Sequence, residues 1–209
     1  MTIIPREPHT GVFTAVFVTV IRDPLRRIGL GITLIATLIG ATAIGAGALR
    51  AQKADAPYIP TPPETVSAML KLAHVTASDV VYDLGSGDGR IVIAAAKEYG
   101  AHGVGIEIDE SLVALAKANA EKAGVEKLVR FEHGDLFNAD IHDATVVTLF
   151  LLSDVNLRLK PKLLRDLKPG TRVISHTFQM GDWKPVDKVN VVGGILYLLK
   201  VPTPAEPGR

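Results

Sequence analysis

Apolar residues recur along the chain with two different periods, which predict strands that alternate with helices. Short runs rich in β-branched and aromatic residues predict strands at 80–82, 103–108, 128–133, 144–150, 171–178, 188–192 and 195–201. Segments with one repeating apolar face predict helices at 63–73, 90–97, 110–123 and 161–167. This alternation is typical of an α/β domain with a largely parallel sheet. The last two strands predict an antiparallel hairpin whose turn is Gly193-Gly194.

Residues 28–49 form an uncharged segment of a different kind, IGLGITLIATLIGATAIGAGAL, with basic residues on both sides. About 20 apolar residues span a bilayer as a helix, so we expect a transmembrane helix here. A cleaved signal sequence and a buried soluble helix are the alternatives. The predicted organisation is an N-terminal cytoplasmic or interfacial segment (1–27), the membrane helix (28–49), a Pro-rich linker (50–62), the catalytic domain (63–201) and a disordered tail (202–209).

Composition and charge support this division of the 209-residue chain. The mean hydropathy of +0.26 is high for one α/β domain, and the excess of apolar residues is concentrated near the N-terminus. Residues 1–54 carry a net charge of +4, whereas residues 55–209 carry 17 basic and 20 acidic residues, a net −3. A domain of that charge lacks the basic surface that phosphate contacts require, so we expect no nucleic-acid partner. Cysteine is absent, which excludes disulfides and Cys metal ligands, and we expect no metal.

A glycine-rich turn follows the strand at 80–82. Asp83 precedes three alternate glycines, Gly85, Gly87 and Gly89, and a helix starts directly after them. The dinucleotide fingerprint G-x-G-x-x-G would need glycine where Arg90 stands, and a phosphate-binding G-x-x-x-x-G-K-[ST] loop is also missing. A second acidic residue, Glu107, stands near the end of the next strand. The pattern therefore indicates a nucleotide-type site other than those two.

The first acid, the glycine turn and the second acid resemble the S-adenosylmethionine (SAM) loop of class I methyltransferases. The resemblance implies a Rossmann-like, seven-stranded mixed sheet with helices on both faces. It also implies that Asp83 and the turn hold the methionine end of SAM, that Glu107 takes the ribose hydroxyls, and that Asp135 with Leu136 receives the adenine. Tyr58 and Thr61 are candidates to reach over the cofactor. The expected cofactor-binding residues are Tyr58, Thr61, Asp83, Gly85, Ser86, Gly87, Asp88, Arg90, Glu107, Asp135 and Leu136.

A closer resemblance rests on four features together: the apolar N-terminal helix, the Pro-rich connector, DLGSGDGRIVIAAAK (83–97) and the aromatic segment 178–185. Together they are similar to the membrane-anchored protein-lysine methyltransferases, which include the mitochondrial enzyme for the c-subunit of ATP synthase. The resemblance implies transfer of a methyl group to a lysine of a membrane protein. The Asn/Asp-Pro-Pro-aromatic motif of many amino-group methyltransferases is absent after strand 144–150, so the acceptor pocket must be built differently. Its candidate residues are Leu151, His176, Phe178 and Trp183, and His176 could relay a proton.

Two other functions stay open at this point: methylation of a small lipophilic molecule such as a quinone or lipid, and SAM binding without catalysis. Two arguments also disagree about the side of the membrane on which the catalytic domain lies. Four basic residues precede the segment 28–49 and two follow it closely, which by the positive-inside rule would place the domain outside. SAM is made and kept in the cytoplasm, so we expect the domain on the cytoplasmic face, with export behind a signal-like N-terminus as the alternative.

Overall fold

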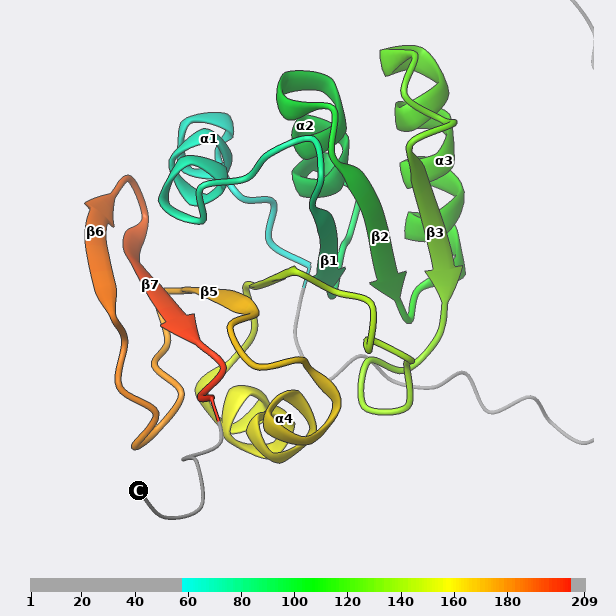
Figure 1. Cartoon of the computed structure of the whole chain (residues 1–209). Helices are drawn as coiled ribbons and strands as arrows, with labels where there is room; N and C mark the ends of the chain where they lie inside the picture. The colour runs from blue at the N-terminus through cyan, green and yellow to red at the C-terminus, as the bar shows by residue number, and fades with distance from the viewer. Residues whose placement is uncertain (1–57, 204–209) are drawn as a thin grey trace, which may run out of the picture. The chain divides into compact units, whose positions relative to one another are not determined.

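The computed structural model describes residues 58–203, which form a seven-stranded mixed sheet flanked by helices (Figure 1). The candidate membrane segment 28–49 and the end of the tail, 204–209, lie outside the described residues. The strand order across the sheet is β3-β2-β1-β4-β5-β7-β6. The strands are β1 (Val80–Leu84), β2 (His102–Glu107), β3 (Val129–His133), β4 (Val146–Leu149), β5 (Arg172–His176), β6 (Asp187–Val191) and β7 (Gly194–Lys200).

The first five strands pair in parallel, and their carboxyl ends therefore lie at one edge of the sheet. β7 runs antiparallel to both β5 and β6, which confirms the closing hairpin. Its turn differs by one residue from the prediction, because Gly194 already pairs with Val191 and the turn residues are Val192 and Gly193. Between β1 and β4 the order of the strands reverses direction, and such a point is where open α/β sheets bind ligands.

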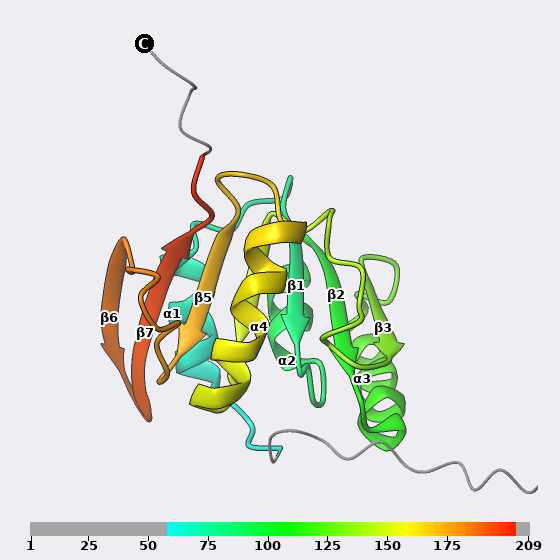
Figure 2. The same ribbon diagram turned by 90° about the horizontal axis from the view of Figure 1, so that it is seen from below.

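Three helices cover one face of the sheet and one covers the other (Figures 1 and 2). On the first face, α1 (Pro63–Leu72), α2 (Arg90–Tyr99) and α3 (Glu110–Ala123) share a core with alternate residues of the strands. On the second face, α4 (Ser153–Asp166) packs on the intervening strand residues. The alternation of buried residues along β1 and β4 supplies both cores, as a strand buried on two faces requires. Helices on both faces were predicted and are confirmed.

The prediction that a helix begins at Pro161 is wrong, because α4 begins at Ser153 and contains that proline in its interior. The apolar run that precedes it was assigned to a strand, but β4 ends at Leu149. A proline inside a helix removes one backbone hydrogen bond. The helix nevertheless continues through it, because Val155, Leu159 and Leu163 are fully buried on its inner face. Burial of an apolar face here outweighs local propensity.

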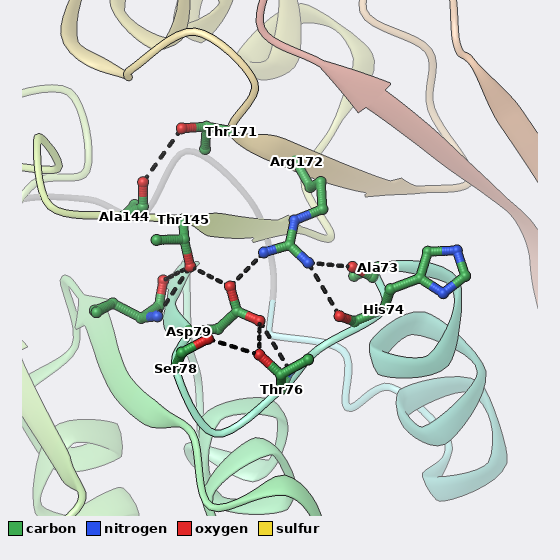
Figure 3. Close-up of polar contacts among 10 residues, drawn as sticks. Ala73, His74, Thr76, Ser78, Asp79, Ala144, Thr145, Thr171 and Arg172 are labelled. Atoms are coloured by element: carbon green, nitrogen blue, oxygen red, sulfur yellow. Dashed lines mark hydrogen bonds and ion pairs between the residues drawn. The ribbon is translucent and has the colours of Figure 1, made fainter.

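A polar network ties the amino ends of the strands to α1 (Figure 3). Asp79, just before β1, accepts hydrogen bonds from the Thr145 hydroxyl at 2.7 Å and the Thr76 backbone at 2.8 Å, and it pairs with Arg172 of β5. The Arg172 guanidinium also donates to the carbonyls of Ala73 and His74 at the end of α1. Backbone carbonyls at a helix end need such donors. The network lies at the sheet edge opposite the carboxyl ends of the parallel strands.

None of the helices within residues 58–203 has the length and apolar composition that a bilayer crossing needs.

Candidate functional site

A cavity of about 220 Å³ opens at the carboxyl ends of β1, β2 and β4, where the strand order reverses. Its walls come from segments far apart in the chain: the stretch before α1, the glycine loop, the end of β2, the start of α3 and the loops after β3 and β4. The lining residues are 58–61, 83, 85–88, 90–91, 106–109, 112, 134–136 and 150–151. Every predicted cofactor residue is among them. The sequence pattern therefore marks one continuous site.

Asp83 is the most deeply buried acid of this site, with 3% of its surface exposed. The Thr148 hydroxyl donates a hydrogen bond of 2.7 Å to its Oδ1 atom. Burial raises the pKa of Asp83 to about 7, the charges of Glu107 and Asp88 add to the rise, and the Thr148 hydrogen bond opposes it. A carboxyl in this state gains most from a cationic partner, since an ammonium group would restore its ionised form. Asp83 is suited to hold the amino group of a bound amino acid moiety.

Glu107 closes the end of β2 and binds the glycine loop from the side. Its Oε2 atom accepts the Gly87 N–H at 2.8 Å, and its Oε1 atom accepts the N–H groups of Ile108 and Asp109 at 2.8 and 3.0 Å. These three donors fix the position of the carboxylate. A carboxylate has about four lone-pair positions, so capacity remains for about one ligand hydroxyl. The arrangement suits recognition of a ribose.

The glycine loop brings its backbone against the cavity. Gly87 has φ +53°, and a Cβ atom there would lie 2.5 Å from Cε2 of Tyr58, so only glycine fits beneath that ring. Gly89 precedes α2 without a side-chain cap, which leaves N–H groups of the first helical turn available to a ligand. The buried Ser86 hydroxyl has no partner among the described residues. Open donors and an unpaired hydroxyl fit a polar cofactor.

Arg90 and Asp88 hold the segment 58–61 over this loop. The Arg90 guanidinium donates to both carboxylate oxygens of Asp88, at 2.9 and 2.6 Å, and to the backbone carbonyl of Thr61 at 2.9 Å. We call residues 58–61 the strap. The strap places Tyr58 and Thr61 in the cavity wall, where the sequence predicted them. Arg90 thus contributes to the site largely by positioning the strap.

Asp135 and Leu136 lie in the cavity wall after β3. The Asp135 carboxylate accepts the Phe137 N–H at 2.9 Å and the side-chain amide of Asn138 at 2.9 Å. Both bonds fix the turn of the chain that brings Leu136 to the same cavity as the glycine loop. These residues are the ones that the family resemblance assigns to the adenine end of SAM, and they lie in the same cavity as the glycine loop.

The four predicted acceptor residues separate in the structure. Leu151 lines the cavity, whereas Phe178 and Trp183 are absent from its wall. Trp183 is buried in the core beneath α4, and its indole N–H donates to the Lys200 carbonyl at 3.2 Å. His176 is buried behind Phe150, with the two ring centroids 4.1 Å apart.

Sequence reasoning missed Thr148 and Phe150, which contact Asp83 and His176 respectively. A hydroxyl inside an otherwise apolar strand could have pointed to Thr148, because a buried polar group needs a partner. Nothing in the sequence pairs Phe150 with His176. Among residues 58–203 there is no group of three or more His, Asp or Glu side chains that could hold a metal ion.

This strand order, with a cavity at the reversal point lined by an acid, a glycine turn and a second acid, defines a class I SAM-dependent methyltransferase. Residues 83–187 match the ANTKMT methyltransferase domain. A protein-lysine N-methyltransferase of Saccharolobus islandicus (strain REY15A) is 50% identical over 139 residues, which cover 66% of this chain and 86% of that protein. A lysine N-methyltransferase of Xenopus laevis, named for the c-subunit of ATP synthase, is 37% identical over 156 residues, which cover 75% of this chain and 67% of that protein.

A solved structure agrees with these sequence relatives in being a methyltransferase of the SAM-dependent kind. It is described as an RNA methyltransferase from Salinibacter ruber in complex with S-adenosyl-L-homocysteine. It shares 54% identity with this chain, has a TM-score of 0.69, and the alignment covers 72% of this chain and 98% of that one. The chain belongs to the ANTKMT methyltransferase domain family of SAM-dependent protein-lysine N-methyltransferases. Its cofactor is SAM.

Proposed function

We propose that this enzyme methylates a lysine of a membrane protein while residues 28–49 anchor it in the same bilayer. The observation that carries the proposal is the position of Tyr58. That residue lines the cofactor cavity, and only residues 50–57 separate it from the apolar segment. An extended chain of that length reaches roughly 30 Å. An anchor at 28–49 would therefore keep the cavity within roughly 30 Å of the membrane surface, in reach of short loops of membrane proteins.

The names of relatives support a lysine acceptor. The Xenopus laevis relative acts, by its name, on a lysine in the c-subunit of ATP synthase. The uncharged segment 28–49 supports a membrane location from the sequence alone. We propose the cytoplasmic face for the domain, because its methyl donor is made and kept there. A difference of two basic residues across the segment is a small bias for the opposite orientation.

We assign the cavity residues to the parts of SAM by their chemistry. Asp83 would hold the amino group of the methionine end, Glu107 the ribose, and the 135–136 loop the adenine. The strap, which Arg90 fixes above the glycine loop, would cover the cofactor. SAM supplies a methyl group on a sulfonium that a nucleophile displaces in line, so the task of the protein is alignment. Phe150 and Leu151 present an apolar wall beside this site, and such a surface favours the neutral, nucleophilic form of a lysine amine.

RNA is the second candidate acceptor, because the Salinibacter ruber structure is described as an RNA methyltransferase. The net charge of −3 over residues 55–209 argues against it, since RNA binding relies on basic side chains that neutralise phosphates. Small lipophilic acceptors remain a third outcome, because a membrane anchor would serve them equally well.

One experiment separates these acceptors. Membranes and RNA from cells that lack the enzyme are incubated with the full-length protein and SAM labelled in its methyl group. The label is then counted in protein hydrolysate, RNA and organic extract. The proposal predicts label in methyl-lysine of a membrane protein, and none of it with Glu107→Ala. Label in RNA or in the organic extract alone would contradict the proposal. Protease added to intact spheroplasts tests the sidedness, since a cytoplasmic domain stays uncut.

A further inference from the structure

β5 ends in a histidine whose ring nitrogens are not satisfied by the protein. The His176 side chain is 1% exposed, and neither Nδ1 nor Nε2 has a hydrogen-bond partner in the part of the chain that the structure describes. Burial of an unpaired polar group is unfavourable, and an apolar ring of similar shape would avoid that cost. A buried imidazole without a partner calls for an explanation, and a group that meets its nitrogen atoms during function would provide one.

The location of His176 points to the acceptor side of the cavity. The β4–β5 register pairs Leu149 with Ser175, so the next residues, Phe150 and His176, lie side by side. Their ring centroids are 4.1 Å apart with a 38° angle between the planes. Phe150 both lines the cavity and contacts the imidazole. One side chain, Phe150, therefore connects the buried imidazole to the cavity, and its ring would have to turn for His176 to meet a methyl acceptor there.

The backbone beyond β5 holds the imidazole in this place through a strained turn. Thr177 has φ +69°, and the Phe178 N–H donates to the His176 carbonyl at 2.8 Å, which closes a three-residue turn of the rare positive-φ kind. A β-branched residue at positive φ is unusual, and such strain is concentrated at functional sites. A Cβ atom at Gly194 would lie 2.4 Å from the Thr177 hydroxyl and 3.4 Å from His176 Nε2. The β6–β7 hairpin therefore packs closely against this turn at Gly194.

The surroundings of His176 favour a neutral imidazole. Burial lowers the pKa of His176, and no charged group contributes to that shift. Phe150, which contacts the ring, and Leu196, which pairs with His176 across the sheet, are both uncharged. A neutral imidazole carries one nitrogen with a free lone pair, which can accept a hydrogen bond.

We propose that His176 accepts a hydrogen bond from the target amine and holds the amine lone pair in line with the methyl carbon. In this step the amine nitrogen bonds to the methyl carbon while the bond from that carbon to sulfur breaks, and the electron pair of the broken bond stays on sulfur. The amine keeps its hydrogens and becomes positive. Its hydrogen bond to His176 strengthens as that charge develops, which stabilises the transition state more than the ground state.

The role requires no proton transfer to His176 during methyl transfer, so it differs from a proton relay. It rests on the proposed function, in which lysine is the acceptor. A hydrogen bond to a charged group is worth a factor of roughly ten to a hundred in rate, so its loss is measurable.

The test compares His176→Phe, which keeps a ring and removes both nitrogens, with His176→Gln, which keeps an acceptor oxygen. Trp183→Phe is the matched control for an aromatic change in the core. For His176→Phe we expect an unchanged or higher Tm of the SAM-free protein and an unchanged Kd for SAM by calorimetry. Methyl transfer to lysine in membranes from cells lacking the enzyme should show a kcat lower by roughly tenfold to a hundredfold. His176→Gln should recover part of that loss.

A kcat for His176→Phe within about threefold of wild type would overturn the proposal, and so would a loss of activity that parallels a loss of SAM affinity. Failure of His176→Gln to exceed His176→Phe would also overturn it. If the wild-type enzyme labels RNA or lipid and no lysine, the proposed acceptor falls and this inference falls with it. A wild type that labels lysine beside a fully active His176→Phe overturns this inference alone.

Discussion

The Thr148 hydroxyl of β4 donates a 2.7 Å hydrogen bond to the Asp83 carboxyl of β1, across the point where the strand order reverses. This bond lowers the pKa of Asp83, whereas burial raises that pKa to about 7. SAM brings a positive charge to the site, and it should bind the ionised carboxyl. The affinity for SAM and the ionisation of Asp83 are therefore linked.

From this linkage we expect SAM affinity to depend on pH. Below about pH 7 the carboxyl must lose a proton before SAM binds, so Kd should rise by roughly tenfold per pH unit. Thr148→Val removes the hydrogen bond that lowers the pKa, so the onset should move to higher pH, while Thr148→Ser should behave as wild type. Calorimetry between about pH 5.5 and 8.5 measures the effect. A Kd that is flat across this range would contradict the role of Asp83.

Asp83→Asn should abolish SAM binding and stabilise the SAM-free protein. The pKa of Asp83 in the folded state lies above its ordinary value of 3.8. Its contribution to stability is therefore fully present below its ordinary value of 3.8, falls as the pH rises above that value and is lost by about pH 7. We expect the amide to raise the free energy of unfolding of the SAM-free protein by about 1–3 kcal/mol at pH 8, with little change at about pH 4. SAM binding should be lost. Urea unfolding at both pH values measures the free energy of unfolding. A variant less stable than wild type at pH 8 would refute this account.

Glu107→Gln tests the ribose contact together with the loop. The amide can accept only at its oxygen, which has two lone pairs, so it cannot receive the Gly87, Ile108 and Asp109 donors and a ribose hydroxyl at once. SAM Kd should weaken by roughly tenfold to a hundredfold. Glu110→Gln, on the exposed first turn of α3, is the control and should bind normally. Equal affinity of Glu107→Gln and wild type would remove Glu107 from the site.

The Asp79 network should contribute to the free energy of unfolding and leave SAM affinity unchanged (Figure 3). Asp79→Asn leaves the Arg172 charge without its partner, and a broken, partly buried pair costs about 2–4 kcal/mol of the free energy of unfolding. Glu132→Gln breaks the Arg130–Glu132 pair, in which the side chains are 59% and 48% exposed, and should cost less than about 0.5 kcal/mol. Both variants should keep wild-type SAM affinity. A large loss of affinity in Asp79→Asn would place the network in the site.

Trp183→Phe distinguishes a core residue from an acceptor contact. The change removes the hydrogen bond to the Lys200 carbonyl and part of the packing beneath α4. We expect a loss of about 1–3 kcal/mol of unfolding free energy and a kcat within about twofold of wild type. A selective fall in kcat at unchanged stability would support the acceptor role that the sequence suggested.

The sequence predicts most of this fold because its signals are local. Gly87 and Gly89 serve turn geometry that only glycine adopts easily, and the acids Asp83 and Glu107 stand at the ends of the strands around them. The start of α4 was not predicted, because the apolar run before Ser153 is as compatible with a strand as with the buried segment that leads into a helix. The contact of Phe150 with His176 depends on the β4–β5 register, and register is a property of the packed sheet.

Mass spectrometry of membrane proteins provides the most direct test of the central claim. Membrane proteins are compared from wild-type cells, from cells without the gene, and from the latter carrying either the wild-type chain or Glu107→Ala. We predict a methyl-lysine on a membrane protein that is absent without the gene, is restored by the wild-type chain and is not restored by Glu107→Ala. An unchanged lysine profile, with a methylated nucleotide or lipid that disappears instead, would contradict the account.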